Sequence, residues 1–281
     1  MRMRPAAERA TLEIAPAEVP AASRPVDDVQ GHWLLARLGK RVLRPGGLRL
    51  TRALLREAGV ARQHVVEFAP GLGRTATLVL DHQPADYIGV DADPHAAKLI
   101  ERLVSPRGRA VAAEAAASGL PDRSADVVLA EGVLTIQSEA GKQHIVAEGV
   151  RLLRPGGRYV LHELALRADA AGEGEGDEIR SALAHAMHVN ARPKTVTEWE
   201  ALLTDNGLQV RMARTSALAL LEPQRILADE GLVGALRFAR NLARDKPARV
   251  RVRTMAQTMR AHKASLQAVG IVAVKPDDSN A

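Results

Sequence analysis

The sequence contains no cysteine and few aromatic residues. The absence of cysteine among 281 residues excludes disulfides, thiolate zinc sites and mechanisms with a cysteine nucleophile. Only 2% of the residues are Phe, Trp or Tyr, so the core must be built from Ala, Leu and Val, and few rings can stack on single-stranded nucleic acid. No run of ~20 apolar residues is present, which argues against a membrane span.

The composition that remains is typical of a globular chain, with 46% hydrophobic and 26% charged residues. Arg2 and Arg4 are not followed by an apolar stretch, so we predict a disordered leader over residues 1–28 and a cytoplasmic protein.

The net charge of +6 is unevenly distributed along the sequence. Residues 223–263 hold ten Lys or Arg against three Asp or Glu, so this basic segment carries +7 and the rest of the chain −1.

Strands and helices alternate from residue 64 onward, which indicates βαβ units and a parallel sheet. Seven strands are expected, over residues 64–68, 87–90, 109–113, 125–130, 158–166, 208–212 and 268–274. Helices are expected over residues 29–43, 48–57, 71–80, 94–103, 141–153, 178–189, 197–206 and most of 224–264. We therefore predict an α/β, Rossmann-like, seven-stranded and mostly parallel sheet with helices on both faces and a helical C-terminal addition.

A glycine turn joins the first of the alternating strands to its helix, in the stretch VVEFAPGLGRTA over residues 65–76. Gly71 and Gly73 permit positive φ and a close approach of the backbone to a ligand. The stretch satisfies the dinucleotide pattern G-x-G-x-x-G/A, and Asp91 lies twenty residues after Gly71, so both features suit NAD.

Three acidic residues favour a different nucleotide ligand. Glu67, Asp91 and Glu114 follow or close the first three strands of the alternating part. A carboxylate at Glu67 would repel a pyrophosphate but attract an ammonium group, Asp91 could accept hydrogen bonds from both ribose hydroxyls, and Glu114 could accept one from the amine of adenine. This arrangement needs no phosphate receptor.

Several motifs together resemble the class I S-adenosylmethionine-dependent methyltransferases. Residues 67–73 (EFAPGLG) look like the first motif of that family, and Asp91 matches its ribose-binding acid. Residues 113–115 (AEA) with 120–128 (LPDRSADVV) look like its third motif and the approach to its fourth strand. The most specific match is 152–160 (LLRPGGRYV), which is similar to the turn into its fifth strand.

The resemblance covers roughly residues 29–166 and is closest to the small-molecule branch that includes ubiquinone and menaquinone methyltransferases. It implies a cofactor-binding core over 29–171, followed over 172–281 by helices that cover the acceptor, the basic segment and the final strands. It implies S-adenosylmethionine as cofactor, held by Glu67, Ala69, Gly71, Gly73, Asp91, Ala92, Glu114, Ala115 and Glu131. Ala69 stands where the family usually has its first glycine, so we expect looser or shifted binding.

Methyl transfer mainly requires alignment of the acceptor with the methyl group, and a general base is needed only when the acceptor keeps its proton. His162 and Glu163, near the end of the fifth strand, are the candidate catalytic residues, with a structural strand histidine as the alternative for His162. Thr135, Gln137, His185 and His188 are candidate substrate contacts. No metal site is predicted, because the spacing of His185 and His188 does not fit a zinc motif.

The predicted function is methyl transfer to an O, N or C nucleophile of a small organic acceptor, which the basic segment would suit if the acceptor is anionic. An NAD-dependent oxidoreductase and a non-catalytic regulatory or nucleic-acid-binding protein are the alternatives, although nucleic acid is disfavoured by the few aromatics. Gly46 and Gly47 either fold over the methionine end of the cofactor or form an ordinary turn. A homodimer stays open as the oligomeric state.

Overall fold

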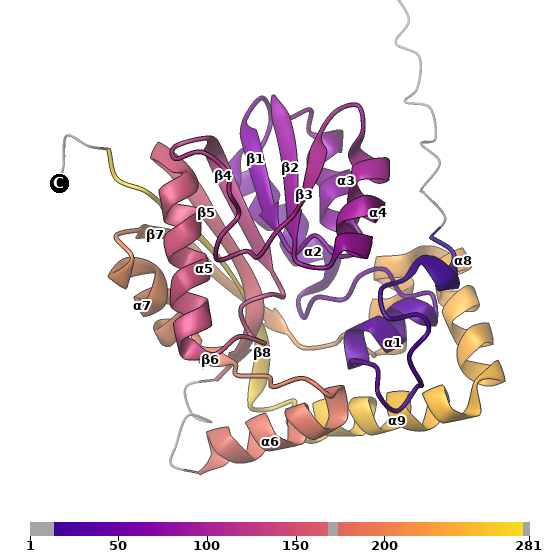
Figure 1. The fold of residues 1–281 in the computed structure, drawn as a ribbon. Coiled ribbons are helices and arrows are strands. Elements are labelled where there is room, and N and C mark those ends of the chain that lie inside the picture. The colour runs from indigo at the N-terminus through magenta and orange to yellow at the C-terminus, as the bar shows by residue number, and fades with distance from the viewer. Residues whose placement is uncertain (1–13, 168–173, 278–281) are drawn as a thin grey trace, which may run out of the picture.

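The computed structural model describes residues 14–167 and 174–277, and its centre is one mixed β-sheet (Figure 1). Its strands follow the order β3-β2-β1-β4-β5-β8-β7. Their bounds are β1 His64–Phe68, β2 Asp86–Asp91, β3 Arg109–Ala112, β4 Ala125–Glu131, β5 Leu153–Leu166, β7 Gln209–Ala217 and β8 Leu266–Val274. Only β8 is antiparallel to its neighbours along this order, so the prediction of seven mostly parallel strands is confirmed. The two-residue strand β6, Lys194–Thr195, pairs with β5 and is too short for a sequence pattern to reveal.

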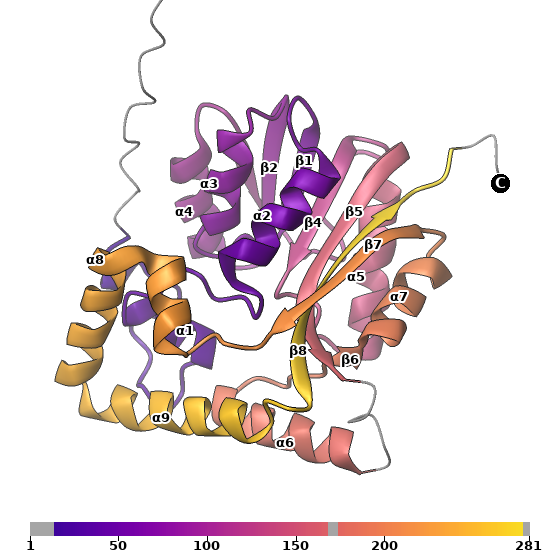
Figure 2. The ribbon, with the colours of Figure 1, turned by 180° about the vertical axis from the view of Figure 1, so that it is seen from behind.

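Helices cover both faces of the sheet (Figures 1 and 2). On one face lie α2 (Gly47–Ala58), α3 (Arg74–Asp81) and α4 (Pro94–Val104), whose apolar residues form one core cluster with β1, β2 and β4. On the other face lie α5 (Glu139–Leu152) and α7 (Val196–Asp205). The apolar stripes of these helices recur at helical spacing and must be buried against the sheet, and this is why the helices were predictable.

Four further helices form a cap beyond the carboxyl ends of the parallel strands (Figure 1). They are α1 (Gly31–Arg37), α6 (Glu175–Met187), α8 (Pro223–Arg244) and α9 (Lys246–Ala261). The cap has its own core, which includes Leu35, Ile179, Phe238 and Met255. Within the part of the chain that is described, no helix is long and apolar enough to cross a bilayer.

The basic segment is divided into two helices rather than one. Asp245 ends α8 and caps α9 by accepting a hydrogen bond from the backbone of Ala248. Gly231 interrupts α8 with φ 70° and ψ 176°, a conformation that glycine adopts without a steric penalty. The chain therefore turns twice in this segment, and the first turn places Asp229 and Glu230 against the sheet domain.

The structure does not support a disordered leader over residues 14–28. Ile14 and Val19 are buried, and they pack with Leu72 and Leu99 from the sheet domain. The two apolar residues lie among Pro, Ala and Glu without a helical or alternating period, so only their tertiary partners reveal them. Residues 1–13 of the predicted leader lie outside the described residues.

Candidate functional site

A cavity of about 490 Å³ lies between the carboxyl ends of the strands and the cap, where ligands bind in open α/β sheets. Eight of the nine predicted cofactor-binding residues line it: Glu67, Ala69, Gly71, Asp91, Ala92, Glu114, Ala115 and Glu131. Gly73 does not. A side chain at Gly73 would meet Leu103 and Ile100 of α4 at 2.2 and 2.9 Å, so this glycine permits the packing of α3 on α4.

The glycine turn contains three residues in the left-handed region. Ala69, Gly71 and Gly73 have φ of 50°, 56° and 71°. This region is available to glycine at little energy, but it costs an alanine on the order of 1 kcal/mol. A glycine at position 69 would adopt this backbone conformation without that energetic cost. The alanine of this chain adopts it with the cost.

Glu67 is a buried acid at the end of β1 that faces the cavity. Its side chain accepts a hydrogen bond of 2.7 Å from the hydroxyl of Tyr87. Burial raises the pKa of the Glu67 carboxyl to about 8, against the lowering effect of the Tyr87 hydrogen bond, and the nearby charge of Glu131 raises it further. A cation in the cavity would favour the ionised form, so the residue is suited to bind an ammonium group.

Asp91 and Glu114 lie farther along the same strand ends. The Asp91 carboxylate accepts hydrogen bonds from the backbone of Gly71 (3.2 Å) and of Asp93 (3.0 Å). Each oxygen keeps a further lone pair for a ligand hydroxyl. Burial raises the pKa of Asp91, although these two hydrogen bonds act in the opposite direction. Glu114 is exposed at the rim of the cavity, two residues after β3.

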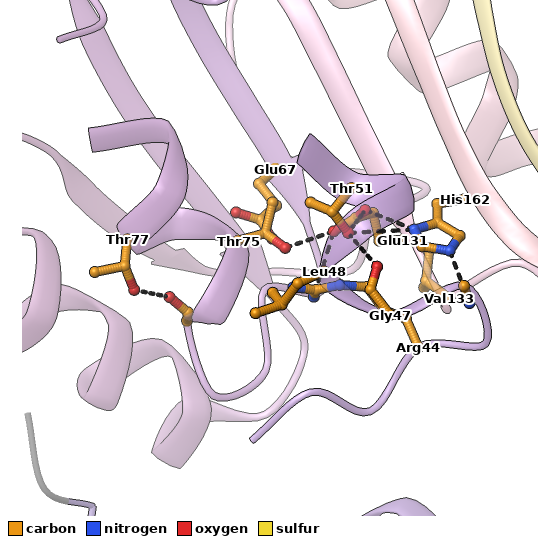
Figure 3. A network of polar contacts seen from close by, with 12 residues as sticks. Arg44, Gly47, Leu48, Thr51, Glu67, Thr75, Thr77, Glu131, Val133 and His162 are labelled. Atoms are coloured by element: carbon orange, nitrogen blue, oxygen red, sulfur yellow. Dashed lines mark hydrogen bonds and ion pairs between the residues drawn. The ribbon is translucent and has the colours of Figure 1, made fainter. Parts of the chain in front are cut away.

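Glu131, the last residue of β4, is the centre of a polar network (Figure 3). Its carboxylate accepts hydrogen bonds from Thr51, from Thr75 and from His162 Nδ1, and lies 3.3 Å from Arg44 Nη1. Burial opposes ionisation, but the charge of Arg44 and these hydrogen bonds outweigh it and hold the pKa of Glu131 at about 2. Glu131 is therefore ionised and joins α2, α3 and β5 to β4.

The segment before α2, residues 41–48, is held by side chains from distant parts of the chain. Glu230 Oε1 accepts hydrogen bonds of 2.9 Å from the backbone of both Arg41 and Val42. His162 Nε2 accepts one of 3.1 Å from Gly46, and Asp229 Oδ1 accepts one of 3.0 Å from Leu48. The N-terminus of α2 is thus bound by Asp229, which argues against the expectation that Gly46 and Gly47 receive the carboxylate of a ligand.

Arg44 is one of four residues of this segment that line the cavity, with Arg41, Leu43 and Pro45. It is nearly buried, with 11% of its side chain exposed, and Nη1 approaches Glu131. Its Nε and Nη2 groups are buried with no hydrogen-bond partner among the described residues. A buried guanidinium with unused donors is costly unless a ligand supplies acceptors. Sequence reasoning missed Arg44, although its place directly before the predicted Gly46-Gly47 turn was a usable signal.

The two candidate catalytic residues have different surroundings. His162 is fully buried, is not part of the cavity wall, and has both ring nitrogens engaged by Gly46 and Glu131. This placement matches the structural alternative and leaves His162 no access to a substrate. Glu163 does line the cavity, but its oxygens accept four hydrogen bonds, from the backbone of residues 133, 134 and 135 and from the Thr135 hydroxyl. Burial raises the pKa of Glu163 to about 7 against the lowering effect of these bonds.

Of the predicted substrate contacts, Thr135 and Gln137 line the cavity, whereas the structure leaves His185 and His188 exposed and outside its wall. The helix α6 presents its other face: Leu183 and Met187, four residues apart, line the cavity. The apolar face of the helix packs inward because burial of Leu and Met is favourable.

Sequence reasoning also missed His32 and Trp33 of α1, which line the cavity beside each other. Burial lowers the pKa of His32 to about 4.

Comparisons with known proteins agree with this geometry. Residues 66–161 match the family described as "Methyltransferase domain". The chain is 30% identical over 220 residues to an uncharacterised protein of Haemophilus influenzae, covering 76% of this chain and 86% of that protein. It is 31% identical over 143 residues to a protein of Mycobacterium sp. that carries a provisional O-methyltransferase name, covering 47% and 63% of the two chains.

The fold is similar to that of the geranyl diphosphate C-methyltransferase of Streptomyces coelicolor, whose structure contains Mg²⁺, geranyl diphosphate and S-adenosyl-L-homocysteine. The TM-score is 0.59 at 14% identity, with 81% of this chain and 78% of the other covered. At this identity the likeness concerns the fold, and the named relatives differ in the atom that they methylate.

Proposed function

Because the chain belongs to the class I S-adenosylmethionine-dependent methyltransferases, we propose that it transfers a methyl group to a small organic acceptor bound between the sheet and the cap. The predictions of the fold, the enzyme class and the cofactor are confirmed. The comparisons favour neither an NAD-dependent oxidoreductase nor a non-catalytic protein on this scaffold. The likeness to the quinone branch stays a prediction, as does the identity of the methylated atom.

The observation that carries the proposal is a pair of oppositely charged, incompletely satisfied side chains in one cavity. Within the described part of the chain, Glu67 has no cationic partner in contact, and Arg44 has two buried donor groups without acceptors. The two groups are close enough to influence each other electrostatically. The ammonium and carboxylate of an amino acid would satisfy both, so the residues present fit the methionine end of S-adenosylmethionine. A pyrophosphate would instead meet a buried carboxyl group, which disfavours NAD.

The remaining wall fits the adenosine end. We assign the ribose hydroxyls to Asp91 and the adenine amine to Glu114, each at the end of its own strand. Bound S-adenosylmethionine supplies a methyl group on a positively charged sulfur, which is already activated for displacement. The chain's own residues orient the cofactor and hold the acceptor in line with it, and Glu131 fixes the surrounding elements from the cavity wall.

The proposal is tested by calorimetric titration of the purified protein with S-adenosylhomocysteine and, separately, with NADH. We expect micromolar binding of the former and none of the latter. Asp91→Ala should weaken binding of S-adenosylhomocysteine by roughly tenfold to a hundredfold, because two hydroxyl contacts to a charged acceptor are lost. Asp122→Ala is the matched control, since this carboxylate is 75% exposed and pairs with Arg151 outside the cavity wall.

Turnover is then measured as transfer of labelled methyl from S-adenosylmethionine to a panel of hydroxy, amino and activated-carbon compounds. Binding of NADH without S-adenosylhomocysteine would refute the proposed function. So would equal affinities of Asp91→Ala and Asp122→Ala for S-adenosylhomocysteine, because the ribose assignment would then be wrong.

A further inference from the structure

The part of the cavity that the cap and the neighbouring loops line is mostly apolar. Its wall comes from α1, the segment before α2, the end of β5, α6 with the loop after it, the loop between β7 and α8, and α9. The apolar side chains of this wall are Trp33, Leu43, Leu164, Leu183, Met187, Val189, Ala191, Leu218, Leu220 and Met259. All ten also belong to, or pack against, the hydrophobic core of the cap. We call this part of the cavity the acceptor chamber.

Charged groups of the cavity wall either have their hydrogen-bonding atoms engaged by other parts of the chain or lie beside the glycine turn. Glu163 receives four hydrogen bonds. The guanidinium of Arg41 donates to three backbone carbonyls, of Ile14, Ala36 and Lys40. Arg44 faces Glu131, and Arg74 is the first residue of α3, directly after the glycine turn. Arg44 and Arg74 thus lie on the cofactor side, and the Arg41 guanidinium is directed to backbone carbonyls, so an anionic acceptor would lie against aliphatic side chains without a cation directed at it.

Two neutral polar side chains complete the chamber wall at the start of α1. Gln30 and His32 both line the cavity. The centroids of the His32 and Trp33 rings are 4.7 Å apart and the rings are tilted by 53°, and the His32 nitrogens have no hydrogen-bond partner among the described residues. The His32 nitrogens can accept a hydrogen bond from an uncharged polar group or donate one to it. Binding pockets commonly combine an apolar wall with a few placed polar groups in this way.

From this wall we infer that the acceptor is an uncharged, mainly hydrocarbon molecule with a small polar group that Gln30 and His32 recognise. The inference rests on the proposed function, which it narrows from any small organic acceptor to an apolar one. It also replaces the expectation of an anionic acceptor, since the basic residues of α8 and α9 do not line the chamber. Met259 is the residue that α9 contributes to the wall.

The inference is tested with two bicyclic probes of nearly equal size, 2-naphthol and naphthalene-2-sulfonate, in the presence of saturating S-adenosylhomocysteine. Affinities are measured by calorimetry and by the fluorescence of the naphthol. We expect 2-naphthol to bind at least about tenfold more tightly than the sulfonate, because the chamber offers no counter-charge. The affinities for 2-naphthol and for 2-methylnaphthalene are also compared between the wild-type protein and His32→Ala, which tests the polar contact. Only the affinity for 2-naphthol should fall in the variant.

Near-isosteric variants locate the bound probe. Met187→Gln and Met259→Gln place an amide in the apolar wall and should weaken 2-naphthol binding by about threefold to tenfold. Leu236→Gln is the control, because Leu236 is 62% exposed on α8 and outside the wall. Retained affinity for S-adenosylhomocysteine shows that each variant is folded.

The outcomes separate the two proposals. If S-adenosylhomocysteine binds but the sulfonate binds as tightly as 2-naphthol, or if both methionine variants behave like Leu236→Gln, the apolar acceptor is refuted while the proposed function stands. If S-adenosylhomocysteine fails to bind the wild-type protein, the proposed function fails and this inference falls with it.

Discussion

Glu67 gives the sharpest prediction, because its carboxyl group must change its protonation state when the cofactor binds. In the free protein burial raises the pKa of Glu67 to about 8, so about nine-tenths of the molecules carry a neutral Glu67 at pH 7. The ammonium group of S-adenosylhomocysteine favours the ionised form. Binding should therefore release a proton, with about 0.9 protons expected at pH 7 and fewer as the pH rises through 8.

The magnitude follows from the linkage between protonation and binding. Below the pKa of the free protein, each fall of one pH unit reduces the ionised fraction of Glu67 about tenfold. The affinity for S-adenosylhomocysteine should thus fall about tenfold between pH 7 and pH 6, which corresponds to about 1.4 kcal/mol. Glu67→Gln should bind more weakly at neutral pH and should lose this dependence, because the amide does not titrate.

Calorimetry in buffers of different ionisation enthalpy measures the proton release directly, and titrations at several pH values give the slope. The other ionisable groups that act on Glu67 are Tyr87, Glu131, Arg44 and Asp91, and all of them are retained in Glu67→Gln. The reasoning is refuted if the wild-type protein releases no proton, or if Glu67→Gln keeps the wild-type slope. The latter result would point to another acid of the cavity, such as Glu163.

The same substitution should have the opposite effect on the free protein. The pKa of Glu67 is higher in the folded chain than in the unfolded chain, so its ionisation opposes folding. Stability is then greatest below about pH 4.5 and decreases as the pH rises toward 8. Glu67→Gln removes this penalty and should raise the free energy of unfolding at pH 7 by about 1–3 kcal/mol, as measured by urea denaturation without ligand. Equal stability of the two proteins would contradict the raised pKa.

Four further variants test the architecture of the site. Ala69→Gly should raise the free energy of unfolding by about 0.5–1 kcal/mol in urea denaturation, because it relieves a positive φ; a lower stability would contradict the strain. Asp229→Asn and Glu230→Gln should each weaken S-adenosylhomocysteine binding by roughly tenfold, because they loosen the segment that carries Arg44; unchanged affinity in both would show that the segment holds its place without them. His162→Gln should lower the free energy of unfolding by about 1–3 kcal/mol and leave the pH dependence of turnover unchanged, whereas loss of the acidic limb from that profile would restore His162 as a base.

The sequence by itself determined the sheet and the glycine turn, and it predicted most of the residues that are proposed to hold the cofactor. A strand, a tight turn and a helix are local, so the stretch around Gly71 and Gly73 predicts the turn without any knowledge of the rest of the fold. The carboxyl ends of parallel strands meet at one edge of a sheet, and therefore Glu67, Asp91 and Glu114 were expected together. Eight of the nine cofactor predictions line the cavity for this reason.

Only the tertiary structure decided the acceptor half. The face that α6 presents to the cavity depends on the packing of α1 and α9 against it, so His185 and His188 remain outside and Leu183 and Met187 lie inside. Arg44 owes its position to Asp229 and Glu230, more than 180 residues away in the chain. Such contacts leave no local periodicity, because burial and hydrogen bonding between distant segments are satisfied only when the whole chain has folded.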